Sequence, residues 1–134
     1  MANALYPSFK ALCLTGGIDL SSATIKIALV DTGTYTYSSA HDFYNDVSAG
    51  VVGTPQTLGS KTTTAGVFDA ADVTFTAVSG ATVEAFVIYK DTGTPATSDL
   101  IAYFDTGQTG LPVTPNGGDI TITFDSGASK IFAL

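Results

Sequence analysis

Alternating apolar and polar residues predict that most of this chain folds into β-strands. Side chains of a strand point to opposite faces in turn, so residues 72–78 place Val73, Phe75 and Ala77 on one face and threonines on the other. Other segments are apolar almost throughout, which is typical of a strand covered on both faces. The predicted strands are 24–30, 72–78, 82–89, 100–104, 119–124 and 131–134, with two weaker ones near 56–64 and at 67–69.

One segment close to the N-terminus has the spacing of a helix instead. Apolar residues recur there at positions 5, 9, 12 and 13, as on one face of a helix. Pro7 suits a first helical turn, where its missing N–H would have no partner. Gly16 and Gly17 supply the left-handed residue that often ends a helix. We therefore expect a short helical segment within residues 1–17.

A chain of 134 residues fits a single domain. Seven or eight short strands separated by turn residues predict an antiparallel β-sandwich, jelly-roll or immunoglobulin-like, with a short N-terminal helix. Residues 31–66 have the weakest pattern, because they are rich in Gly, Ser, Thr and Tyr. We expect this stretch to be a long irregular connection, which in a compact domain is usually functional or mobile.

The charge of the chain excludes two classes of partner. The chain has five lysines, no arginine, eleven aspartates and one glutamate, which gives a net charge of -7. Nucleic-acid binding needs clustered basic residues, so we expect no nucleic-acid partner and no anionic membrane partner. No apolar run approaches the ~20 residues that span a bilayer, and the first residues do not have the pattern of a signal peptide.

Few side chains are available for catalysis. The chain has one cysteine, Cys13, one histidine, His41, and no tryptophan. It lacks the Gly-x-Ser-x-Gly pattern of a nucleophile elbow, and no cluster of residues has metal-ligand spacing. We therefore expect a non-enzymatic protein without a cofactor or metal, although calcium held by aspartates from separate loops stays open.

The triplet Asp-(Thr/Ser)-Gly occurs four times, at 31–33, 91–93, 105–107 and 125–127. In aspartic proteases such a triplet presents one of two carboxylates that share a proton. Aspartate also accepts a hydrogen bond from the backbone two residues further on, and glycine allows a positive φ. Because each copy follows an apolar strand, the turn interpretation is favoured over the protease.

Aromatic residues gather in the N-terminal segment and in the weakly patterned stretch. Tyrosine is favoured at protein interfaces, since its ring is apolar and its hydroxyl polar. The alternative is that these rings cover one end of the sandwich. The residues predicted as a partner interface are Leu5, Tyr6, Phe9, Tyr35, Tyr37, Phe43 and Tyr44.

Five segments spread over nearly the whole chain share the pattern of one family. They are residues 16–20, 24–31, 35–43, 84–93 and 111–122. Through them the chain resembles the small virion structural proteins of tailed bacteriophages. No catalytic residue is attached to that family, so none is carried over.

Among virion proteins, a short, acidic, β-rich chain most resembles a head decoration (cement) protein. The resemblance implies a protein made in the bacterial host cytoplasm that binds the outer surface of the head and stabilises contacts between major capsid subunits. Its partner would be the phage major capsid protein, and self-association into a small cyclic oligomer is compatible with the sequence. The alternatives are a tail or neck component and a host-surface glycan-binding module; the lack of tryptophan counts against the second.

Overall fold

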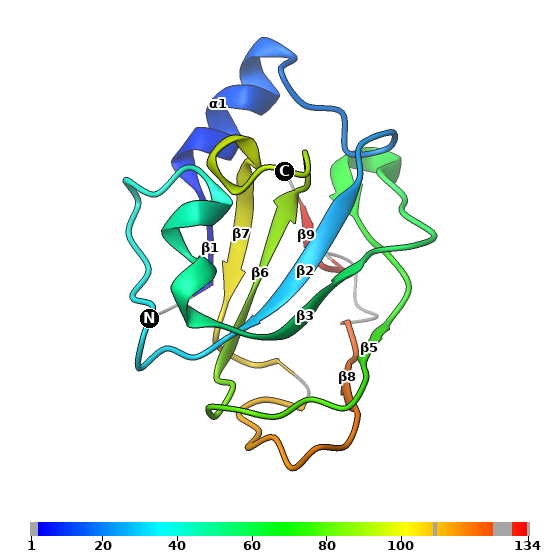
Figure 1. Ribbon diagram of the computed structural model, residues 1–134. Coiled ribbons are helices and arrows are strands. Elements are labelled where there is room, and N and C mark those ends of the chain that lie inside the picture. Colours follow the sequence, from blue (N-terminus) through cyan, green and yellow to red (C-terminus); the bar gives the residue numbers. More distant parts are fainter. Residues whose placement is uncertain (1–2, 109, 125–129, 134) are drawn as a thin grey trace.

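Five antiparallel strands form the largest sheet of the computed structural model, which describes residues 3–108, 110–124 and 130–133. Figure 1 shows this sheet at the centre of the molecule. In spatial order its strands are β1 (Ala4–Leu5), β7 (Leu100–Phe104), β6 (Ala85–Lys90), β2 (Ile25–Val30) and β3 (Val51–Thr57). The strand β1 was not predicted from the sequence, because two residues are too short to show a period.

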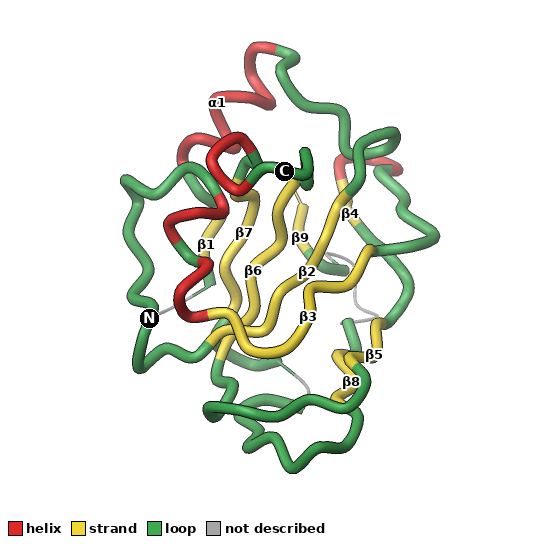
Figure 2. Tube along the Cα trace, in the orientation of Figure 1, coloured by secondary structure: helices red, strands yellow, loops and turns green. Residues whose placement is uncertain are grey.

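Two smaller antiparallel sheets accompany the large one. One pairs β4 (Val67–Phe68) with β9 (Phe132–Ala133), and the other pairs β5 (Val73–Phe75) with β8 (Ile120–Ile122). Figure 2 shows the pair β5–β8 near the edge strand β3, which contacts β5. The predicted fold class is therefore confirmed: the protein is mainly β, with antiparallel sheets consistent with a β-sandwich and one short helix near the N-terminus.

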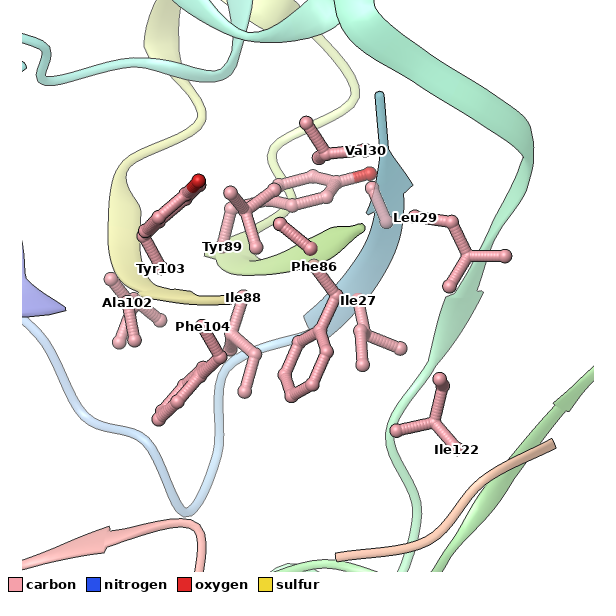
Figure 3. Packing of buried hydrophobic residues seen from close by; sticks show 14 of the residues in the cluster. Ile27, Leu29, Val30, Phe86, Ile88, Tyr89, Ala102, Tyr103, Phe104 and Ile122 are labelled. Carbon is pink, nitrogen blue, oxygen red and sulfur yellow. The ribbon is translucent and has the colours of Figure 1, made fainter. Parts of the chain in front are cut away.

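The central strands β6 and β7 are buried along nearly their full length. Phe86 in β6 pairs with Phe104 in β7, while Val87 pairs with Tyr103 one position along. Because side chains alternate, the phenylalanines and Tyr103 lie on opposite faces of the sheet, and Figure 3 shows them pointing in opposite directions. This explains why the sequence of these strands is apolar throughout instead of alternating.

The phenylalanine face forms the interior of the sandwich. The Phe86 ring lies 5.1 Å from Phe104 and 6.1 Å from Phe124, measured between ring centroids. Ile27 and Leu29 of β2 lie opposite Ile88 and Phe86 on the same face. Burial of this apolar surface is the main source of stability that the large sheet offers.

The helix α1 (Pro7–Thr15) confirms the predicted helical segment. Pro7 begins it, and Gly16 ends it with a φ of 72° and an N–H bonded to the Leu12 carbonyl. Phe9 faces inward, with its ring 5.7 Å from that of Phe132, whereas Leu14 is 89% exposed. Among the described residues, no helix has the length and hydropathy to cross a membrane.

The stretch 31–66 is less irregular than predicted, because it contains β3 and three short 3-10 helices: η1 (Tyr44–Asp46), η2 (Ser48–Gly50) and η3 (Thr64–Gly66). The sequence pattern does not indicate β3 clearly, because the strand contains Gly53, whose φ is 73°, and Pro55. Both are tolerated because β3 is an edge strand with a register shift against β2. A fourth 3-10 helix, η4 (Pro95–Thr97), precedes β7.

Candidate functional site: a tyrosine-covered face of the sheet

All six tyrosines of the chain lie on the face of the large sheet opposite the phenylalanines. Tyr89 and Tyr103 project from β6 and β7. Tyr44 stacks on Tyr89 at 4.3 Å between ring centroids, and Tyr35 and Tyr37 lie 6.1 and 5.4 Å from Tyr103. The set that we call the tyrosine face is Tyr6, Tyr35, Tyr37, Tyr44, Tyr89 and Tyr103.

A chain of hydrogen bonds crosses this face from the interior towards the surface. The Tyr6 and Tyr35 hydroxyls are 2.8 Å apart, and the Tyr35 hydroxyl is 2.9 Å from Nδ1 of His41. The donors and acceptors match when the Tyr6 hydroxyl donates to Tyr35 and the Tyr35 hydroxyl donates to Nδ1 of His41. Burial raises the pKa of both tyrosines, so they remain protonated donors at neutral pH.

We expect the replacement Tyr35→Phe to destabilise the protein more than Tyr6→Phe. Without the Tyr35 hydroxyl, the fully buried Tyr6 hydroxyl has no hydrogen-bond partner among the described residues, which costs about 1–3 kcal/mol. Tyr6→Phe leaves Tyr35 bonded to His41, so its cost should stay near ~1 kcal/mol. Urea unfolding followed by circular dichroism measures both free energies; an equal or reversed order would contradict this hydrogen-bond chain.

The structure corrects three of the seven residues predicted as a partner interface. Tyr6, Phe9 and Tyr35 are 0, 0 and 4% exposed. Their side chains belong to the core because the N-terminal segment and the loop after β2 both fold back onto the sheet. These three side chains are therefore not accessible to a partner in this fold.

The other four predicted interface residues are partly buried. Three of them pack against the edge of the hydrophobic core, namely Leu5, Tyr37 and Tyr44. The backbone of Phe43 pairs with that of Asp99 in an isolated β-bridge. Their remaining exposure is compatible with contact to a partner, so for them the interface stays a prediction.

A hollow of about 290 Å³ opens at one end of the tyrosine face. It lies where β2 and β7 end and β6 begins, because Val30 pairs with Ala85 and Phe104 with Phe86. The loops at these strand ends supply its polar lining. Its walls are formed by Thr32, Tyr35, Thr36, Tyr37, Glu84, Tyr103 and Asp105.

Glu84, the only glutamate of the chain, is fixed in this hollow by one of its oxygens. Its Oε2 accepts hydrogen bonds from the backbone N–H of Thr32 at 3.1 Å and from the Thr32 hydroxyl at 2.9 Å. The neighbouring Tyr103 hydroxyl donates to Asp105 at 3.2 Å. Burial, together with the negative charges of Asp105 and Glu84, raises the pKa of Tyr103. Nothing in the local sequence around Glu84 indicates that its side chain lines a hollow together with three tyrosines.

The Asp-Thr-Gly triplets act as turns where the structure describes their contacts. Asp31 Oδ1 accepts the Gly33 N–H at 2.9 Å, and Asp91 Oδ1 accepts that of Gly93 at 3.0 Å, which confirms the turn interpretation for these two copies. Asp31 follows β2 and Asp91 follows its antiparallel neighbour β6, so the two carboxylates lie at opposite ends of the sheet. They cannot share a proton as a protease pair must. The copy at 125–127 lies outside the described residues.

Two lysines away from the tyrosine face have partners within the chain. Lys26 and Asp91 form an ion pair at 3.2 Å, and Lys61 donates to the Ala23 carbonyl. Backbone hydrogen bonding from Gly93, followed by the influence of Lys26, lowers the pKa of Asp91. Within residues 3–108, 110–124 and 130–133, no three His, Cys, Asp or Glu side chains are grouped so as to hold a metal ion.

A second hollow lies between the end of α1 and the small sheet of β4 and β9. Its lining is mostly apolar and includes Cys13, Ile18, Leu20, Phe68 and Phe132. Burial raises the pKa of the Cys13 thiol above its ordinary value.

No family model matches the chain, and no curated protein matches it. The structure itself establishes the antiparallel fold, the tyrosine face and the hollow at its end.

Proposed function

We propose that the protein is a non-enzymatic structural component of a tailed-bacteriophage virion, a decoration protein on the outer surface of the head. It binds the major capsid protein there and stabilises contacts between capsid subunits. The observation that carries this proposal is the resemblance over segments 16–20, 24–31, 35–43, 84–93 and 111–122, which are spread along most of the chain.

The physical properties of the chain support such a mechanical role. The large sheet is covered on both faces, and the side chains of β6 and β7 are almost fully buried, so the body resists deformation. A protein that binds only the assembled shell stabilises that state by mass action. A net charge of -7 keeps it away from the packaged genome and soluble at high local concentration.

The copy number in purified virions tests the proposal. We expect this protein to be present at a number comparable to that of the major capsid protein, as measured by quantitative mass spectrometry of purified particles. A handful of copies per particle would place it in the tail or neck instead. Its absence from particles would overturn every virion role.

A second measurement separates stabilisation from mere presence. Particles that lack the protein should release their DNA at lower temperature or weaker osmotic shock than complete particles, and adding back the purified protein should restore resistance. Equal resistance with and without the protein would contradict the cement role even if the copy number is high.

A further inference from the structure

We infer that Asn116 is a deamidation site, at which the main-chain nitrogen of Gly117 displaces the side-chain amide as ammonia, and that backbone pairing with Val78 restrains this reaction in the folded protein. Such a modification is independent of the proposed place in the virion, so the copy number in particles does not bear on it.

Asn116 is the only asparagine of the chain that precedes a glycine. Because glycine has no Cβ, its nitrogen approaches the carboxamide of the preceding residue with the least steric hindrance. The other two asparagines, Asn3 and Asn45, precede alanine and aspartate. Residues 116–118 are all exposed, so water reaches the turn both to take up a proton and to hydrolyse the product.

The carboxamide of Asn116 is folded back onto its own main chain. Its Oδ1 accepts the Gly118 N–H at 2.9 Å. The same donor stabilises the negative charge that develops on Oδ1 when a nitrogen attacks Cγ, as the donors of an oxyanion hole do. Gly117 has a φ of 88°, which glycine adopts without strain. The group under attack is therefore oriented and polarised in the folded protein.

The attacking nitrogen, in contrast, is held by a second segment. The Gly117 N–H donates to the Val78 carbonyl at 2.8 Å, and the Val78 N–H donates to the Gly118 carbonyl at 2.9 Å. A third bond joins the segments, because Asp119 Oδ1 accepts the Ala77 N–H at 3.1 Å. These bonds extend the pairing of β5 with β8, at the end of the molecule opposite α1 (Figure 1). Attack by the Gly117 nitrogen therefore requires local opening of this pair.

The reaction balances with water as its only co-reactant. Once the pair opens, the Gly117 nitrogen gives its proton to water or hydroxide and bonds to Cγ of Asn116, and the side-chain nitrogen leaves as ammonia. Water then opens the resulting succinimide ring at either carbonyl. One product is aspartate, and the other is isoaspartate, whose main chain is longer by one methylene. Both products carry one more negative charge than asparagine.

Peptide mapping by mass spectrometry tests the site after incubation of the full-length protein in mildly alkaline buffer. In concentrated urea, we expect Asn116 to show the mass change from amide to carboxylate before Asn3 and Asn45 do. In the folded protein the conversion of Asn116 should be at least about tenfold slower, because only the open fraction reacts.

Two variants of Asp119 separate the restraint from the charge. Asp119→Ala and Asp119→Asn both remove one negative charge, but only asparagine keeps an oxygen that accepts the Ala77 N–H. We expect Asp119→Ala to speed the conversion in the folded protein about fivefold, whereas Asp119→Asn should stay close to the unchanged protein. In urea the two variants should react at equal rates, and circular dichroism should show that both are folded without urea.

Three results would overturn the inference. Reaction of Asn3 or Asn45 ahead of Asn116 in urea would show that Gly117 does not determine the site. Equal rates at Asn116 in the folded and unfolded protein would show that pairing with Val78 does not restrain it. Equal rates in folded Asp119→Ala and Asp119→Asn would show that the reaction does not pass through opening of this pair.

Discussion

Replacing Phe86 with alanine is expected to lower the free energy of unfolding by about 3–5 kcal/mol. Phe86 is 1% exposed and contacts the rings of Phe104 and Phe124. It sits in the middle of the large sheet, opposite Leu29 on one side and Phe104 on the other. Rigid strands on both sides keep the structure from collapsing into the space, so the variant loses both apolar transfer energy and packing.

This loss is comparable to the whole stability of a small domain, about 5–15 kcal/mol. Because the chain has no tryptophan, urea unfolding is best followed by far-ultraviolet circular dichroism. Leu14→Ala is the control, as Leu14 is 89% exposed, and it should change stability by no more than ~0.5 kcal/mol. If Phe86→Ala does not fold, Phe86→Leu should show a smaller loss in the same direction. A Phe86 variant as stable as Leu14→Ala would contradict the observed packing.

The protein is expected to unfold cooperatively in alkali as its buried tyrosines ionise. Burial raises the pKa of Tyr6, Tyr35, Tyr44, Tyr89 and Tyr103, whereas in the unfolded chain each ionises near pH ~10. The folded state thus binds more protons than the unfolded state above that pH. Their contribution to stability is complete below pH ~10 and is lost as the pH rises further.

The size of the effect follows from the number of rings. Each tyrosine that ionises only in the unfolded state reduces stability by about 1.4 kcal/mol per pH unit, so several together remove the whole stability within one or two pH units. Absorbance at 295 nm should therefore rise steeply, together with loss of the circular dichroism signal. In concentrated urea the same absorbance should rise gradually around pH ~10. Gradual ionisation with the fold retained would show that the tyrosine face is open to water.

Local patterns predicted much of the secondary structure. The segment 24–30 became β2 and 100–104 became β7 with almost unchanged bounds, and Pro7 and Gly16 bound α1 as expected. These features depend on neighbouring residues, which the sequence displays directly. Of the edge strand β3, the sequence predicted only the last residues, within the weak strand near 56–64. Gly53 and Pro55 are unusual in a strand and are allowed here by its place at the edge.

The candidate site was predicted only in part. The aromatic residues from Tyr35 to Tyr44 were recognised as a group with a shared role, but the sequence left open whether they face a partner or the core. The structure shows that Tyr35 faces the core, because its side chain is only 4% exposed. Glu84 was missed because its partner Thr32 is 52 residues away.

The sequence by itself determined the β-rich fold class, the N-terminal helix, the turn role of Asp31 and Asp91, and the acidic charge, since each follows from composition or from residues near one another. Only the tertiary structure decided that all six tyrosines share one face and that a hollow with Glu84 opens at its end. The physical reason is that strand pairing joins residues distant in the chain, and two faces of a fully buried strand have the same apolar pattern.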